Sequence, residues 1–350
     1  MLSQQAVEVR MNYIRRAWDL EELPYPPFIV RPRGKWYATR RFLEEPRSDL
    51  EAQMKMIEEE TPIDDYAVPA LYTGVGIAVV AAAFGGKVQI FEGDKDPWTA
   101  PLINDVDPQN LYKFRLPDPH KSGMNPLVFE RIRTFQEGST LPLRVCNIPS
   151  PLTIASQVWD YTSFLTALYE YPKEVHHLLD LATEATIEFV KAQLEKIHNP
   201  FGLTHEDWYI PRKYGLRVSD DVLAEISPAH YREFAVPYNN RLSEEFGGIF
   251  VHSCGDVTHN LEVLKEIRGL RGIEVNAPQN HMEALKEKVA GRMVVSLRCW
   301  SMDWVGNNIP ALEGYTKELI DYLGTKGLLL QIQTSDIAEA HHLAQAIKEA

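Results

Sequence analysis

The amino-acid sequence predicts an α/β protein of 350 residues, a (β/α)8 TIM barrel built as a single domain. Two observations carry this prediction. Eight short segments rich in apolar and β-branched residues recur along the chain, and longer segments with helical periodicity lie between them. Strands that alternate with helices pair in parallel through helical crossovers, and eight such units close into a barrel. An open doubly wound sheet is the alternative architecture.

The eight expected strands are each bounded by glycine, proline or polar residues, as strands usually are. They are residues 28–30, 68–72, 143–147, 201–204, 248–252, 272–276, 292–299 and 328–333. The chain has no short-period repeat, low-complexity tract or Gly/Ser linker, which favours one domain over two.

The helices are marked by apolar residues three and four positions apart. The clearest is 171–197, where apolar residues at this spacing predict one buried face along a long helix: Val175, Leu178, Ala182, Ala185 and Phe189. Later helices with the same kind of pattern are expected at 260–267, 282–289, 312–323 and 338–349.

Two segments fall outside the strand–helix alternation. Residues 1–27 are expected to form an N-terminal helical extension, with a helix at 7–20 that the prolines at 24, 26 and 27 stop. Residues 85–141, rich in Pro, Asp and Gly, are predicted to be an insertion or lid between the second and third strands.

The charge and apolar content exclude several classes of protein. Acidic residues outnumber basic ones by 49 to 36, and a net charge of -13 repels phosphate backbones and acidic membrane surfaces. The longest uncharged apolar run, 77–84, is less than half of the roughly 20 residues that a membrane helix needs. The first residues lack the pattern of a secretory signal, so we expect a cytoplasmic enzyme.

Cysteine and histidine residues near strand ends suggest a metal site. Only three cysteines are present, which argues against a disulfide framework. His252 and Cys254 lie two residues apart, on the same side of an extended chain, at the end of the fifth strand. Glu274 and Cys299 fall near the ends of the next two strands. A ligand set of this kind, rich in sulfur, suits Zn²⁺.

Each of these residues also has a structural interpretation. Cys146 has no ligand-type neighbour and is assigned to the core. For Cys299, metal ligation and core packing remain open, and for Glu274 a salt bridge is the alternative to ligation.

Further candidates come from acidic loops and aromatic residues. Glu206 and Asp207, together with Asp220 and Asp221, are expected in loops around the fourth strand, where they can orient substrate or a metal-binding histidine. Solvated acids are the alternative interpretation. An aromatic substrate pocket is expected from Trp159, Tyr161 and Trp208, with core packing as the alternative.

Three segments carry a resemblance to a known family. Residues 215–221 (GLRVSDD), 226–238 (ISPAHYREFAVPY) and 252–255 (HSCG) resemble the uroporphyrinogen decarboxylase superfamily, which also contains zinc-dependent, corrinoid-linked methyltransferases. The resemblance is strongest from about 172 to 276, and 97–98 and 101 also resemble the family. It implies a (β/α)8 barrel.

The resemblance implies two possible functions, a decarboxylase and a methyltransferase, and the two depend on different residues. In the decarboxylases, arginines near the N-terminus and an Asp at the second strand act on a tetrapyrrole without a cofactor. Here 31–37 (RPRGKWY) echoes the arginine segment, but the second strand ends in 71–73 (LYT) and the last strand leads into 333–335 (QTS). These departures count against the decarboxylase.

In the methyltransferases, zinc is held by a His-x-Cys pair and a further Cys. His252 and Cys254 match the pair. The last strand carries Gln331, Gln333 and Thr334 where the family has its second Cys, so Cys299 is a candidate substitute.

These considerations lead to one expected function and two alternatives. We expect a zinc-dependent methyltransferase that moves a methyl group between a small methylated substrate or thiol and a corrinoid (cobalamin) carried by a partner protein. Arg31, Tyr161, Trp208 and Gln333 are its expected substrate-pocket residues. A cofactor-free tetrapyrrole decarboxylase and a non-catalytic binding barrel are the alternatives. The substrate and the direction of transfer stay open.

Overall fold

The computed structural model describes residues 2–32, 43–91, 97–106, 108, 111–300 and 309–349. Of the arginine-containing segment 31–37, residues 33–37 lie outside these described residues.

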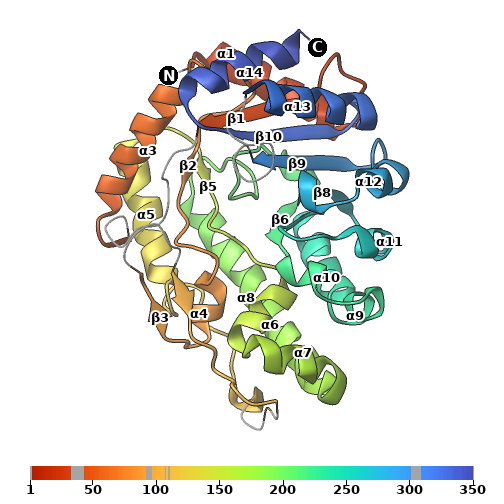
Figure 1. The fold of residues 1–350 in the computed structure, drawn as a ribbon. Coiled ribbons are helices and arrows are strands. Elements are labelled where there is room, and N and C mark those ends of the chain that lie inside the picture. The colour runs from red at the N-terminus through yellow and green to blue at the C-terminus, as the bar shows by residue number, and fades with distance from the viewer. Residues whose placement is uncertain are drawn as a thin grey trace.

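A six-stranded parallel sheet forms most of the barrel wall, in the order β1-β10-β9-β8-β7-β6 (Figure 1). Its strands are β1 (Phe28–Pro32), β6 (Leu216–Ser219), β7 (Ile249–Ser253), β8 (Leu270–Asn276), β9 (Val294–Trp300) and β10 (Leu328–Thr334). Because all of these strands are parallel, their carboxyl ends meet at one rim of the barrel, where sites in such barrels lie.

Two short strands complete the wall between β1 and β6. β2 (Leu71–Tyr72) pairs in parallel with β5 (Leu143–Arg144). The Tyr66 amide donates a hydrogen bond to the Phe28 carbonyl at 2.9 Å, which ties the approach to β2 to β1. Isolated bridges from Leu143 to Pro200 and from Leu203 to Leu216 connect β5 to β6. The predicted α/β fold, a TIM barrel, is therefore confirmed.

The expected fourth strand was placed wrongly. Of residues 200–204, only Pro200 and Leu203 form isolated bridges, whereas β6 (Leu216–Ser219) is the fourth barrel strand. Pro200 has no N–H to donate to a ladder, and Gly202 has φ +130, a value outside extended geometry. The other seven predicted strands match β1, β2, β5, β7, β8, β9 and β10.

Helices surround the sheet and cover its outer face (Figure 1). Their bounds are α1 (Gln4–Trp18), α3 (Pro46–Glu60), α4 (Val79–Ala83), α5 (Asn125–Gly138), α6 (Pro151–Val158), α7 (Tyr161–Glu170), α8 (Pro172–Lys196), α9 (Pro228–Phe234), α10 (Val236–Phe246), α11 (Leu261–Leu264), α12 (Met282–Lys288), α13 (Ile309–Leu323) and α14 (Ile337–Lys348). α8 buries its predicted apolar face, so the expected long helix is confirmed. Among the described residues, no helix is both long enough and apolar enough to span a membrane.

The two segments set apart in the sequence contain regular structure. α1 packs next to the amino ends of β6 and β7, where Trp18 stacks on Tyr214 and meets Phe250 edge-on, with ring centroids 5.1 Å apart in each case. Within 85–141 lie the antiparallel pair β3 (Val88–Gln89) and β4 (Trp98–Thr99), and also α5. The role of 85–141 as a lid stays a prediction.

Gly247 ends α10 in the left-handed conformation, with φ 80 and ψ 15. A Cβ added there would meet no atom within 4 Å, so the cost of Gly247→Ala is purely conformational. We expect this change to lower the free energy of unfolding by about 1–2 kcal/mol. Gly314→Ala is the matched control, because Gly314 lies within α13 and is equally open; there alanine should stabilise the helix. Chemical denaturation of both variants tests the difference.

Candidate metal centre

Asp221, His252 and Cys254 meet at the carboxyl ends of β6 and β7. Each offers one ligand atom, and these atoms all lie within 4.8 Å of one another. His252 Nε2 is 3.2 Å from Cys254 Sγ. The Cys254 amide donates a hydrogen bond to Asp221 Oδ1 at 3.2 Å, which fixes the loop after β7 to the short helix η3 (Asp221–Ala224). We call these three residues the candidate metal centre.

Glu274 lies behind His252 and does not enter the candidate metal centre. Its Oε1 lies 2.9 Å from His252 Nδ1, a contact at ion-pair distance, while His252 Nε2 lies 3.2 Å from Cys254 Sγ on the other side of the ring. Burial, and then the charge of Arg217, lower the pKa of His252 and keep the imidazole neutral. The structure therefore places Glu274 behind the imidazole of His252, outside the three residues of the candidate metal centre.

A buried arginine lies beneath this pair. Arg217 is 1% exposed, and its Nη2 is 2.6 Å from Glu274 and 3.1 Å from Glu206. Although burial opposes ionisation, the charge of Arg217 lowers the pKa of Glu274 to about 2 and that of Glu206 well below its usual value. Arg217 Nη1 also lies 2.8 Å from His205 Nε2. Glu206 is thus part of a charge network in the barrel interior.

Asp207 belongs to a second buried network. Arg144 Nη1 lies 2.6 Å from Asp207 Oδ1, and Arg31 Nε lies 3.2 Å from Oδ2. Burial opposes ionisation of Asp207, but the charges of Arg31 and Arg144 lower its pKa. Arg31 also pairs with Glu60. The positive charge of Arg31, a predicted pocket residue, is therefore neutralised by two carboxylates inside the protein.

Asp220 does not face the candidate metal centre. Its side chain is 0% exposed, and its carboxylate accepts hydrogen bonds from Tyr231 at 2.8 Å and Asn239 at 3.4 Å. Burial raises the pKa of Asp220 to about 6. These contacts hold the end of β6 against α9 and α10, so Asp220 positions its neighbour Asp221 without itself reaching the site.

The structure does not bring Cys299 to His252 and Cys254. Neighbouring residues of a strand point to opposite faces, and Arg298 uses the inner face, where its Nη1 lies 3.5 Å from His252 Nε2. Cys299 consequently points outward, where its thiol interacts with Tyr315 of α13 and burial raises its pKa to about 12. Asp221, and not Cys299, is therefore the residue that the structure groups with His252 and Cys254. Cys146 is 0% exposed, as expected for a core residue.

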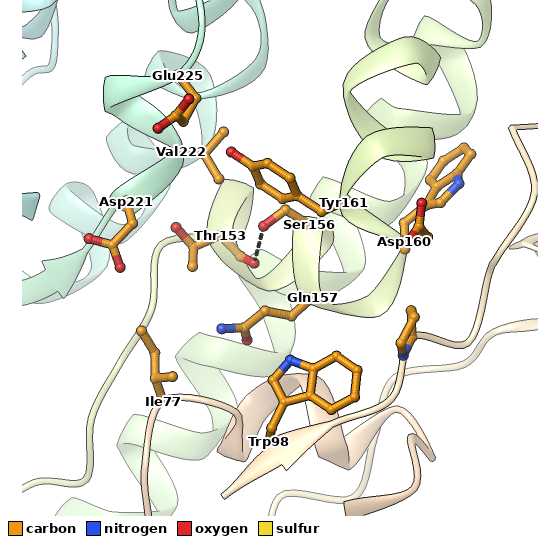
Figure 2. A pocket seen from close by; sticks show the side chains of 12 residues that line it. Ile77, Trp98, Thr153, Ser156, Gln157, Asp160, Tyr161, Asp221, Val222 and Glu225 are labelled. Atoms are coloured by element: carbon orange, nitrogen blue, oxygen red, sulfur yellow. Dashed lines mark hydrogen bonds between the residues drawn. The ribbon is translucent and has the colours of Figure 1, made fainter. Parts of the chain in front are cut away.

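A cavity of about 520 Å³ adjoins Asp221 (Figure 2). Its wall includes the predicted pocket residue Tyr161, and also Trp159, whose indole N–H donates to the Asp105 carbonyl at 2.8 Å. Trp208, in contrast, is 0% exposed and belongs to the core. Gln333 lies on β10 opposite Arg31 and is not among the residues of this cavity wall.

Several residues of the site were missed in the sequence. Arg217 would have been expected in the interior if 216–219 had been recognised as a strand, because alternation places it on the same face as Ser219, which it contacts at 3.0 Å. Trp98, Gln157 and Glu225 line the cavity and had no sequence signal of function beyond the family-like 97–98.

The fold is an α/β barrel whose candidate metal centre lies at the carboxyl ends of the strands. Comparison with known proteins gives the family of the chain. Residues 23–197, half of the chain, match the model of the uroporphyrinogen decarboxylase (URO-D) family. The chain belongs to this family. The resemblance was expected to be strongest over residues 172–276. The match to the family model, over 23–197, lies mainly N-terminal to that segment.

Curated relatives share the family at low identity. Uroporphyrinogen decarboxylases from Hydrogenobaculum sp. (strain Y04AAS1) and Azoarcus sp. (strain BH72) are 26% and 27% identical over 183 and 188 residues. These alignments cover 49% and 52% of this chain and 50% and 47% of the relatives. The chain therefore spans about half the length of the curated relatives it matches.

Solved structures share the fold over nearly the whole chain. A methyltransferase from Methanosarcina mazei has a TM-score of 0.72 at 18% identity and covers 98% of each chain. A B12-independent methionine synthase from Shewanella sp. W3-18-1 has a TM-score of 0.51 at 11% identity, over 94% of this chain and 97% of the other. At these identities the likeness is one of fold.

Proposed function

We propose that this protein is a zinc-dependent methyltransferase that moves a methyl group between a small substrate and a corrinoid on a partner protein. The observation that carries the proposal is the convergence of Asp221, His252 and Cys254, whose ligand atoms lie within 4.8 Å of one another. The barrel fold shared with the Methanosarcina mazei methyltransferase is consistent with it.

The donor set fits zinc. Histidine nitrogen, cysteine sulfur and carboxylate oxygen are its usual ligands, and three protein ligands with one open position are typical of catalytic zinc. The 3.2 Å between His252 Nε2 and Cys254 Sγ is close to the roughly 3.5 Å expected between nitrogen and sulfur on one tetrahedral zinc ion. The carboxylate of Glu274 behind the imidazole is the partner that metal-binding histidines commonly have.

The residues then have separate tasks in methyl transfer. Bound zinc would lower the pKa of a substrate thiol or neutralise charge on a departing heteroatom. His252 and Cys254 would hold it, Asp221 would complete the set, and Glu274, 2.9 Å from His252 Nδ1, would hold the imidazole in place. The cavity beside Asp221 would receive the substrate.

A cofactor-free decarboxylase is the second candidate, favoured by the names of the curated relatives. Its polycarboxylate substrate would need arginines that are free to bind acids. Arg31 and Arg144 instead pair with Asp207, and Arg31 also pairs with Glu60. The cavity, moreover, is lined by carboxylates. Both features disfavour this candidate.

Assays of the purified protein separate the two. With methylcobalamin and a thiol, we expect zinc-dependent methyl transfer that Cys254→Ser abolishes and Cys299→Ser, the matched buried control, retains. Consumption of uroporphyrinogen by metal-free protein would instead establish the decarboxylase. Turnover in zinc-free protein would contradict the proposal.

Zinc uptake is expected to release a proton. Cys254 reaches the surface, but burial of much of its surroundings and the charge of Asp221 raise the pKa of its thiol to about 11. The thiol is therefore protonated at neutral pH, whereas zinc binds the thiolate, so apparent affinity should rise about tenfold per pH unit from pH 7 to 9. His252 is already neutral there because its pKa is lowered. Titration with a pH indicator measures the release, and a pH-independent affinity would contradict ligation by Cys254.

A further inference from the structure

The cavity beside Asp221 has a wall made by four separate parts of the chain, one of which contributes Ile77. Asp221, Val222 and Glu225 come from η3 and its end, Thr153, Ser156 and Gln157 from α6, Asp160 and Tyr161 from the start of α7, and Trp98 from β4. Figure 2 shows Asp221 and Glu225 on one side of this cavity and Trp98 across from them. A volume of about 520 Å³ is within the range of pockets that bind small molecules.

The charged side chains among the described residues of this wall are all acidic. It contains Asp160, Asp221 and Glu225, and among the described residues that line it none is Lys, Arg or His. Asp160 is partly engaged, because its carboxylate accepts from the Ser163 amide at the start of α7. For Glu225, which is exposed, no ion pair is found within the described part of the chain. Glu225 is thus available to a ligand, whereas Asp221 Oδ1 already accepts a hydrogen bond from the Cys254 amide.

Gln157 adds a buried acceptor. Its Oε1 is buried and has no hydrogen-bond partner among the described residues, and the side chain lies in the cavity wall. A buried amide oxygen without a partner is unfavourable unless a ligand or water donates to it. Gln157 therefore adds a polar side chain to a wall that also carries carboxylates.

The aromatic residues fit the same kind of ligand. Trp98 is 45% exposed and Tyr161 is 40% exposed, so both present ring surface to the cavity side. Burial, and then the charges of Glu225 and Asp221, raise the pKa of Tyr161, so its hydroxyl stays protonated at neutral pH. Aromatic faces beside carboxylates are a favourable environment for an organic ammonium group.

We propose that this cavity binds the ammonium end of the substrate, so that the substrate class is an amine-bearing thiol or methyl thioether. This inference rests on the proposed function for its sulfur end, which lies at the candidate metal centre. Asp221 belongs to both the centre and the cavity wall and so links the two ends. Arg298, whose Nη1 lies 3.5 Å from His252 Nε2, does not line the cavity, and its Nη2 lies 4.0 Å from a Glu206 carboxylate oxygen.

Binding of three methyl thioethers tests the proposal on the full chain, both as purified and after chelation of metal. S-methylcysteamine has a cationic tail, S-methylmercaptoethanol a neutral one and S-methylmercaptopropionate an anionic one, while the methylthio group is the same. We expect affinity to fall in that order in ligand-observed NMR titrations. Equal affinities, preference for the anion or absence of binding would overturn the proposal.

Two variants test whether the preference for the cationic ligand comes from the wall of the cavity. Glu225→Gln and Trp98→Leu are each expected to weaken S-methylcysteamine binding by about two- to fivefold and to leave the neutral ligand unchanged. Glu130→Gln, at an exposed position on α5, is the matched control and should change neither. An equal loss in Glu130→Gln would show a nonspecific charge effect and overturn the proposal.

The design separates this inference from the function on which it rests. A cation preference in chelated protein that shows neither zinc binding nor methyl transfer would leave the cavity assignment standing and refute the methyltransferase. Zinc-dependent methyl transfer to thiols without any cation preference would support the methyltransferase and refute the assignment of the cavity.

Discussion

Replacing Arg217 with methionine is expected to lower the free energy of unfolding by about 3–5 kcal/mol. The guanidinium is 1% exposed and lies within 3.1 Å of both Glu206 and Glu274. Methionine fills much of the volume, but it leaves two carboxylates in the interior without their main compensating charge. An unpaired buried charge costs more than the net stabilisation of an intact pair. Urea denaturation measured by circular dichroism gives the difference.

Two further variants identify the cause. Arg232→Met removes an exposed arginine that is 2.7 Å from Glu266, and its effect should be small because solvent screens that pair. Adding Glu274→Gln to Arg217→Met should recover part of the lost stability, since one of the unpaired charges is then removed. If the double variant is as unstable as the sum of both single changes, lost packing rather than unpaired charge explains the effect.

Zinc affinity is expected to fall at least about 100-fold in Cys254→Ser. Zinc binding by four protein ligands has a free energy of about 10–16 kcal/mol, so one ligand contributes roughly 3 kcal/mol. His252→Ala and Asp221→Asn should show losses of the same order, because their ligand atoms belong to the same group. Competition with a chromogenic chelator measures each affinity.

Glu274→Gln and Cys299→Ser test how much the two other predicted ligands contribute to zinc affinity. Glu274→Gln should weaken zinc binding by about 10- to 100-fold, since the carboxylate orients His252 from 2.9 Å without occupying a ligand position. Cys299→Ser should leave affinity unchanged, because this thiol faces α13. A loss in Cys299→Ser as large as that in Cys254→Ser would show that the thiol reaches the metal.

Most of the fold could be predicted because apolar runs and helical periodicity are local properties. The long helix α8 and seven of eight strands were predicted in this way. The fourth strand was not, since 201–204 and 216–219 both read as short apolar segments. What separates them is the backbone at Pro200 and Gly202, which limits residues 200–203 to isolated bridges.

The pairing of His252 with Cys254 was determined by the sequence alone. Side chains two positions apart on an extended chain share a face, and the structure places their ligand atoms 3.2 Å apart. The third residue of the candidate metal centre, Asp221, was decided only by the tertiary structure. Which face of β9 points inward depends on its register with β8 and β10, and this turns Arg298 toward His252 and Cys299 toward α13. Asp221 reaches Cys254 from a different strand end because β6 and β7 lie side by side, a proximity that no local pattern encodes.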